Sequence, residues 1–182
     1  DTFFGLTGKP FQLNPDPSFY YGSRGHKRAF AYLEYGLYQS EGFIVITGEI
    51  GAGKTTIVRN LLEQLDPEKV VAAQIVSTQL DADDLLRAIG VAFGLPVRSV
   101  NKAVLLASIE AYLCQLATEK KRALLVVDEA QNLTKRAMEK LRMLTNFQFG
   151  DQALLQSFLV GQPELRQLMQ SAELQQLRQR VI

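Results

Sequence analysis

Residues 48–56 have the residue types and the spacing of a phosphate-binding loop. Within this stretch, Gly48 to Thr55 fit the pattern G-x-x-x-x-G-K-[ST], in which glycines let backbone N–H groups surround phosphate oxygens. Lys54 would reach the β- and γ-phosphates, and the hydroxyl of Thr55 would bind Mg²⁺. The predicted nucleotide-binding residues are Gly48, Glu49, Ile50, Gly51, Ala52, Gly53, Lys54, Thr55 and Thr56. This stretch therefore predicts a protein that binds a nucleoside triphosphate with Mg²⁺.

A second group of polar residues follows two apolar runs further along the chain. Asp128 and Glu129 come directly after the run 123–127, where two acids are costly unless they have partners or a chemical role. Asp128 is a candidate Mg²⁺ ligand beside Thr55, and Glu129 is a candidate for orienting the water that attacks the γ-phosphate. Gln162 follows the run 153–160 and is a candidate sensor of the γ-phosphate, with a plain turn residue as the alternative.

These side chains can act together only if a parallel sheet brings the ends of their strands to one edge. Apolar and periodic stretches predict strands at 43–47, 70–76, 123–128 and 153–160, and helices at about 54–65, after Asp81, after Asn101, from Thr134 to Gln148 and over 164–179. The nearly continuous apolar run 70–76 suggests a strand covered on both faces. The expected fold is α/β, with helices between parallel strands.

The 182 residues are expected to form one domain: an irregular, aromatic arm at 1–22 packed on a core at 23–182. The arm could form one side of an adenine site, or it could only pack on the core without touching a ligand.

A net charge of +1 and a charged fraction of 21% exclude a disordered or generally basic chain. A single cysteine, Cys114, suits a reducing compartment. The chain begins without Met and stops in mid-pattern, which suggests a fragment.

The order of these elements resembles that of a P-loop ATPase of the AAA+ type. No Asn-Lys-x-Asp motif for guanine follows a strand, so ATP is the expected nucleotide. The sequence motifs resemble those of one branch of this type, the general secretion pathway A (ExeA-like) ATPases, which include those found with exosortase systems. The matching blocks are Phe3-Phe4-Gly5-Leu6, Thr47-Gly48-Glu49, Asp128-Glu129-Ala130-Gln131-Asn132, Gly161-Gln162-Pro163-Glu164-Leu165 and Leu177-Arg178-Gln179-Arg180.

The resemblance implies a three-layer AAA+ core with a mainly parallel sheet, in which the helical lid and the last core strand are missing. It implies an ATPase that works as a homo-oligomer, with Arg180 as the arginine finger that reaches a neighbour's ATP and Arg178 as the other choice. It also implies a partner in envelope secretion. The domain would be cytoplasmic, and any attachment to the inner membrane would lie outside this chain.

Two other functions fit the same core. A DNA-acting ATPase of the transposition-helper type would use basic residues such as Lys135, Arg136 and Lys140. A nucleotide-gated binding module would grip the nucleotide without turnover.

Overall fold

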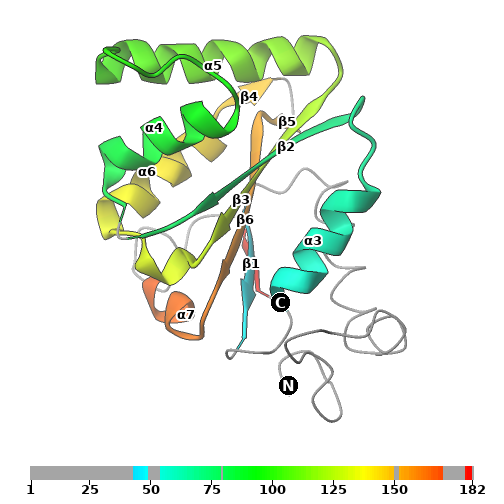
Figure 1. The fold of residues 1–182 in the computed structure, drawn as a ribbon, viewed down its shortest axis with the longest axis vertical. Helices are drawn as coiled ribbons and strands as arrows, with labels where there is room; N and C mark the ends of the chain where they lie inside the picture. The colour runs from blue at the N-terminus through cyan, green and yellow to red at the C-terminus, as the bar shows by residue number, and fades with distance from the viewer. Residues whose placement is uncertain (1–42, 49–53, 79, 150–151, 170–178, 182) are drawn as a thin grey trace.

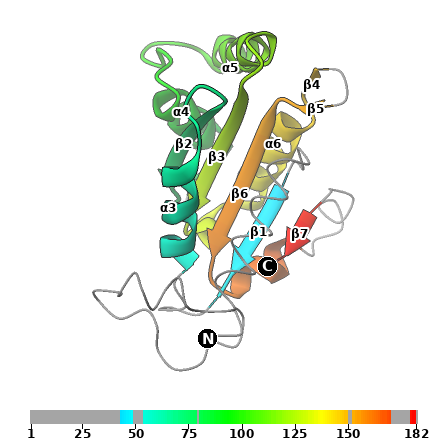
Figure 2. The same ribbon diagram turned by 90° about the vertical axis from the view of Figure 1, so that its right-hand side faces the viewer.

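The fold is a twisted parallel sheet with helices on both faces. The computed structural model describes residues 43–48, 54–78, 80–149, 152–169 and 179–181. The expected arm at 1–22, and the 23–42 segment after it, lie outside these residues. The five strands of the sheet lie in the order β2-β3-β6-β1-β7, which Figure 2 shows from left to right. Their bounds are β1 Phe43–Thr47, β2 Val70–Val76, β3 Arg122–Asp128, β6 Leu155–Gly161 and β7 Gln179–Val181.

Helix α3 covers one face of the sheet, and α4, α5 and α6 lie on the other, so that the domain has three layers (Figure 1). The helices are α3 Lys54–Gln64, α4 Ala82–Ala92, α5 Lys102–Thr118, α6 Lys135–Thr145 and α7 Glu164–Met169, with a 3₁₀ turn η2 at Ala130–Asn132. A two-stranded antiparallel hairpin, β4 Gln148–Phe149 and β5 Gln152–Ala153, leads from α6 into β6.

The alternation of side chains along the buried strands divides the core in two. On β3, Leu124 and Val126 pack toward α3, whereas Leu125 and Val127 pack toward α4, α5 and α6. The α3 side is filled around Phe158, which is fully buried. Because a β-strand points successive side chains to opposite faces, the continuous apolar run of β3 is the pattern that a doubly covered strand requires. This confirms the predicted α/β fold with a mainly parallel sheet.

Two helices on the second face, α5 and α6, begin at side chains that cap them, whereas α4 follows Asp81, whose side chain makes no capping hydrogen bond. The side chain of Asn101 accepts a hydrogen bond from Val104 N at 2.9 Å, and Oγ1 of Thr134 accepts one from Ala137 N at 3.0 Å. These bonds satisfy backbone donors that the first turn of a helix leaves unpaired. Gly94, which has a φ of 80°, follows the end of α4. The predicted starts at Asn101 and Thr134 are therefore confirmed.

The structure corrects three predictions about individual elements. The strand 70–76 is at the edge of the sheet, and its side chains alternate: Ala72, Gln74 and Val76 are exposed, so it is not covered on both faces. Helix α6 ends at Thr145, and Gln148 belongs to β4 rather than to the helix. The physical reason is local, since Asn146 caps the helix and alternating Phe147 and Phe149 suit a hairpin better.

The third correction concerns the end of the chain. The sequence predicts a helical tail through Gln179, with the last core strand missing. Residues 179–181 instead form β7, which pairs in parallel with β1; α7 is described over Glu164–Met169, and residues 170–178 lie outside the described residues. The short run Gln179–Val181 gains a full ladder partner beside β1, which outweighs a weak local helical preference. The fifth strand of the sheet is therefore present.

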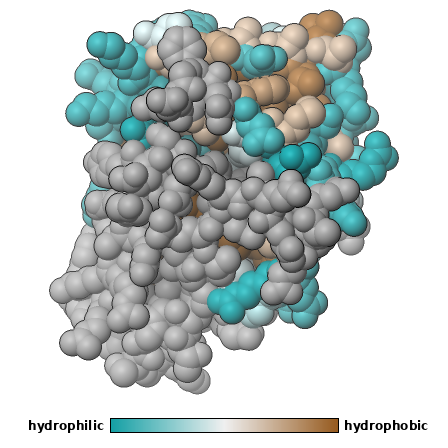
Figure 3. Space-filling model, turned by 180° about the vertical axis from the view of Figure 1, so that it is seen from behind, coloured by the Kyte–Doolittle hydropathy of each residue, from teal (hydrophilic) through white to brown (hydrophobic). Residues whose placement is uncertain are grey.

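Hydrophobic residues gather in the upper part of the back view, among hydrophilic ones (Figure 3). Three large hydrophobic side chains of the described residues are exposed, namely Val76, Val91 and Val104.

Among the helices of the described part of the chain, none combines the length and the apolar character that a membrane span requires.

Candidate functional site

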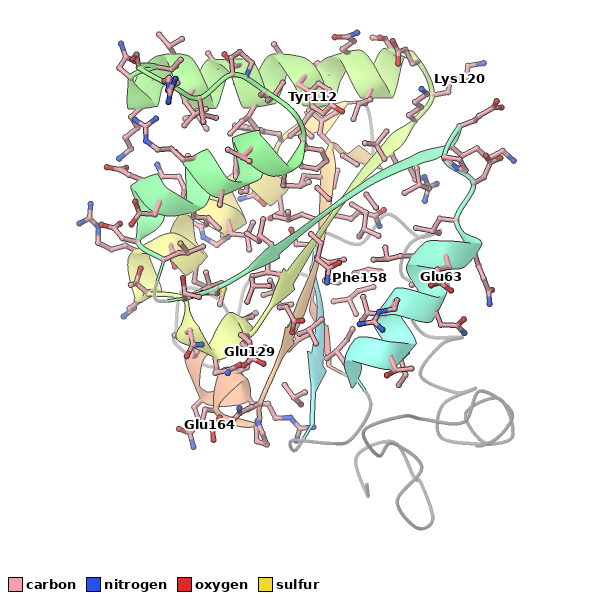
Figure 4. The ribbon with its side chains drawn as sticks, in the orientation of Figure 1. Glu63, Tyr112, Lys120, Glu129, Phe158 and Glu164 are labelled. Carbon is pink, nitrogen blue, oxygen red and sulfur yellow. The ribbon has the colours of Figure 1, made fainter. Side chains whose placement is uncertain are left out.

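The sheet brings the ends of three strands to one edge. Thr47, the last residue of β1, is in register with Gly161, the last residue of β6, and the N–H of Gly48 donates to the carbonyl of Gly161 at 3.2 Å. On the other side of β6, Val127 of β3 pairs with Leu159. The start of α3 and the carboxylate of Glu129 lie at this same end of the molecule (Figure 4). In parallel sheets this edge is where ligands bind.

The predicted phosphate-binding loop connects β1 to α3 at this edge. The strand ends at Thr47 and the helix begins at Lys54, which confirms the predicted strand and helix on either side of the loop. Residues 49–53, and with them Glu49, Ile50, Gly51, Ala52 and Gly53, lie outside the described residues. The backbones of Lys54 and Thr55 form the first turn of α3, with a half-buried Thr56 next to them. A helix start carries partial positive charge, which favours an anion at this position.

The two acids stand where β3 leaves the sheet. Asp128 is the last residue of β3, and its Oδ1 accepts a hydrogen bond from the N–H of Glu129 at 2.9 Å. Its carbonyl accepts a bond from the N–H of Ser77 at 2.9 Å, which ties the end of β2 to the end of β3. Glu129 itself has a left-handed backbone, with φ 53° and ψ 41°. For a residue with a β-carbon this conformation is strained, and such strain is concentrated at functional sites.

The side chain of Gln131 joins Glu129 to the end of β6. Its Nε2 donates to Oε2 of Glu129 at 2.6 Å, and its Oε1 accepts from the backbone N–H of Gln162 at 3.1 Å. Gln162 is half-buried directly after β6. The structure thus brings Glu129 and Gln162, two residues predicted for the site, into one hydrogen-bonded group through a third residue that carried no prediction.

A hydrogen bond from α7, which the sequence does not predict, fixes the end of β1. Nε of Arg166, on α7, donates to Oγ1 of Thr47 at 2.9 Å. Thr47 is buried, with 1% of its surface exposed, so its hydroxyl needs a partner inside the protein. Arg166 therefore holds α7 against the residue that precedes the predicted phosphate-binding loop. The only hint in the sequence is a hydroxyl at the end of an apolar strand.

The residues present fit a Mg²⁺ ion that is held partly by the nucleotide. Among the described residues, no group of three or more His, Cys, Asp or Glu side chains could hold a metal by themselves. Magnesium at nucleotide sites uses one or two protein oxygen ligands together with phosphates and water. Asp128, the last residue of β3, is a carboxylate of this type at the same edge of the sheet.

Arg180 lies away from this edge. Its backbone is in β7, in register with Ile44, three positions before Thr47 on the neighbouring strand. At about 3.3 Å per residue this is roughly 10 Å from the end of β1. The structure therefore brings together the loop ends, Asp128, Glu129 and Gln162, whereas the backbone of Arg180 lies further back along the sheet, beside Ile44. Arg178 lies outside the described residues.

The chain is similar to known proteins in sequence and in fold. The chain is 42% identical over 180 residues to general secretion pathway protein A of Aeromonas hydrophila. That match covers 98% of this chain and 33% of the relative, so the chain spans about a third of that protein's length.

Solved structures with the same fold include the Aeropyrum pernix ORC2 protein in its ADP form, with a TM-score of 0.65 and 16% identity over 98% of this chain and 50% of that one. Cdc6p from Pyrobaculum aerophilum has a TM-score of 0.62 and 17% identity over 100% of this chain and 48% of that one. These likenesses show the fold. The model of one family, described as the AAA domain, matches residues 37–169, which is most of the chain. This chain belongs to the AAA domain family.

Proposed function

We propose that this domain binds ATP with Mg²⁺ in the loop 48–56 and hydrolyses it to ADP and phosphate. The observation that carries the proposal is the meeting of three strand ends: β1 enters the loop, β3 ends in Asp128 and Glu129, and β6 ends beside Gln162. A fold shared with a protein solved with ADP adds support.

Each residue of the group has a distinct role in this proposal. Lys54 binds the β- and γ-phosphates, and the backbone of the loop surrounds them. Thr55 and Asp128 hold Mg²⁺, which neutralises charge on the phosphates when it is bound. Gln162 reads the γ-phosphate through its side-chain amide. These positions place the phosphates against the start of α3, whose partial charge is of the right sign.

Glu129 orients the attacking water in this scheme. Its carboxylate accepts a hydrogen bond from the water, the water oxygen forms the new bond to phosphorus, the bond to the ADP oxygen breaks, and the proton that the water loses passes by way of the Glu129 carboxylate to the released phosphate or to solvent. Positioning accounts for most of the catalysis in phosphoryl transfer, because the protein itself forms no covalent bond to the phosphate. The left-handed backbone and the bond to Gln131 hold Glu129 in one place.

The experiment measures ATP binding and steady-state phosphate release for the wild type and three variants. Glu129→Gln should keep ATP affinity and lose turnover, and Lys54→Ala should lose binding. Glu164→Gln is the matched control: Glu164 is an exposed acid at the same end of the molecule, on the first turn of α7, and its loss should leave turnover unchanged (Figure 4). Equal turnover in the Glu129→Gln and Glu164→Gln variants would overturn the proposal.

We propose further that Arg180 acts on the ATP of a neighbouring copy, so that turnover needs a homo-oligomer. The support is its distance from its own site: β7 pairs with the early part of β1. An arginine supplied in trans can raise the rate by about 10³-fold or more. Turnover per subunit should then rise with protein concentration in the wild type. In Arg180→Ala turnover should stay low at every concentration while ATP affinity is kept; a concentration-independent wild-type rate would refute the role.

The partner that hydrolysis acts on is proposed from the relative. General secretion pathway protein A suggests an envelope secretion system as the partner, and the cytoplasmic side of the membrane as the place where the domain meets ATP. Residues 1–22 would form an arm packed on the core of 23–182. Co-purification of the full-length protein with envelope secretion components in ATP, but not in ADP, would test this role.

A further inference from the structure

Gln131 makes two hydrogen bonds whose chemistry fixes the orientation of its side chain. The carboxylate of Glu129 can only accept a hydrogen bond, so it must face the Nε2 donor, at 2.6 Å. The backbone N–H of Gln162 can only donate, so it must face Oε1, at 3.1 Å. A flipped amide would lose both bonds. The amide therefore has one orientation, and in it Gln131 spans from the end of β3 to the end of β6.

The Gln131 amide lies in a narrow space beside Gly161. A β-carbon added to Gly161 would lie 2.6 Å from Oε1 of Gln131 and 3.3 Å from its backbone N. The turn that carries Gln131, η2, packs against both β6 and α7. Ala130, next to Gln131 in this turn, is completely buried. The amide is thus seated between fixed backbone elements, and its position depends on that of the end of β6.

We propose that Gln131 is a positioning residue, which holds the carboxylate of Glu129 and couples it to the segment that reads the γ-phosphate. A shift of the Gln162 backbone would move the amide, and the amide would move the carboxylate with it. This inference rests on the proposed function, because it needs Glu129 to orient the attacking water. It assigns to Gln131 no contact with the nucleotide, so its loss should change turnover and leave ATP affinity alone.

The first test separates turnover from binding. In the full chain, Gln131→Ala should lower kcat about 10- to 100-fold, the usual cost of misplacing a catalytic group, with ATP affinity within about twofold of the wild type. Gln131→Glu keeps the shape and the acceptor for Gln162 N–H but replaces the donor to Glu129 with a second carboxylate. It should lower kcat at least as much. Far-UV circular dichroism and urea midpoints establish that each variant is folded.

A double-mutant cycle tests whether Gln131 acts through Glu129. The Glu129→Gln, Gln131→Ala double variant should turn over no more slowly than Glu129→Gln alone, because the group that Gln131 positions is already gone. A residue that only supports the fold would lower both rates by the same factor. Equal factors in the two backgrounds would overturn the inference.

Gly161→Ala provides an independent test at a residue of a different strand, the last residue of β6. The added methyl would displace the Gln131 amide and lower kcat in the wild-type background. In the Gln131→Ala background the oxygen at 2.6 Å is absent, and only the looser contacts with Cδ2 of Leu165 at 3.1 Å and the backbone N of residue 131 at 3.3 Å remain, so the further loss of kcat should be smaller than in the wild-type background.

The outcomes separate the two proposals. Wild-type turnover in both Gln131→Ala and Gly161→Ala, with Glu129→Gln inactive, would overturn the role of Gln131 alone. Full turnover in Glu129→Gln would overturn the proposed function and this inference together.

Discussion

The left-handed backbone of Glu129 predicts that glycine at this position makes the protein more stable than alanine does. Glu129 has φ 53° and ψ 41°, where a β-carbon costs about 1–2 kcal/mol in contact with the next carbonyl. Glycine avoids that cost but has about 0.5–1 kcal/mol more backbone entropy to lose on folding. The difference leaves Glu129→Gly more stable than Glu129→Ala by roughly 0.5–1 kcal/mol. Both variants lack the carboxylate, so the comparison isolates the backbone.

Urea unfolding followed by far-UV circular dichroism measures this difference, since the chain has no tryptophan. In thermal unfolding, the Tm of Glu129→Gly should be about 1–4 °C higher than that of Glu129→Ala. Ala107→Gly is the control. Ala107 is exposed in the middle of α5, where glycine should instead cost about 1 kcal/mol. The reasoning is refuted if Glu129→Gly is no more stable than Glu129→Ala while Ala107→Gly shows its ordinary loss.

Three further predictions concern the layers that hold the site. Phe158→Ala should lower the free energy of unfolding by about 3–5 kcal/mol in urea titrations, because Phe158 is fully buried; a loss below about 1 kcal/mol would contradict this packing. Thr134→Ala should cost about 1 kcal/mol in the same assay, whereas Thr134→Ser, which keeps the capping oxygen, should cost less. Burial, and secondarily Glu119, raise the pKa of Tyr112 above 10.0. The folded state therefore binds this proton more tightly, and stability present below pH 10 is lost as the pH rises through the folded-state pKa. Tyr112→Phe should flatten this alkaline fall in stability, and an unchanged fall would contradict it.

Long periodic elements could be predicted from the sequence because one local signal determines them. Helix α5 begins at the Asn101 cap and keeps Leu105, Ile109 and Leu113 on its buried face. The strand that ends in Asp128 is an unbroken apolar run. Where the local signal was ambiguous, the prediction failed. Leu144 and Gln148 have helical spacing, which conceals the hairpin that the Gly150-Asp151 pair suggests in the sequence.

Features that depend on which strands are neighbours could not be predicted. The composition of 70–76 suits a central strand, yet β2 is at the edge, because the order of strands is set by the whole topology. The last strand, β7, is recognisable only from its pairing with β1. The role proposed for Gln131 depends on the close approach of the ends of β3 and β6. Nothing within the motif around Asp128 and Glu129 reveals that approach.

The pairing of β1 also has a consequence for how the protein is made. Phe43 is in register with Ser157 on one side and Gln179 on the other, and both partners are synthesised long after β1. During translation this apolar, β-branched segment has no neighbour to cover it. Such long-range pairing slows folding and leaves the unpaired edges of an apolar strand exposed to aggregation. Among the strands of the described sheet, β1, which leads into the predicted phosphate-binding loop, thus waits longest for a partner strand, and we expect it to benefit most from a chaperone at the ribosome.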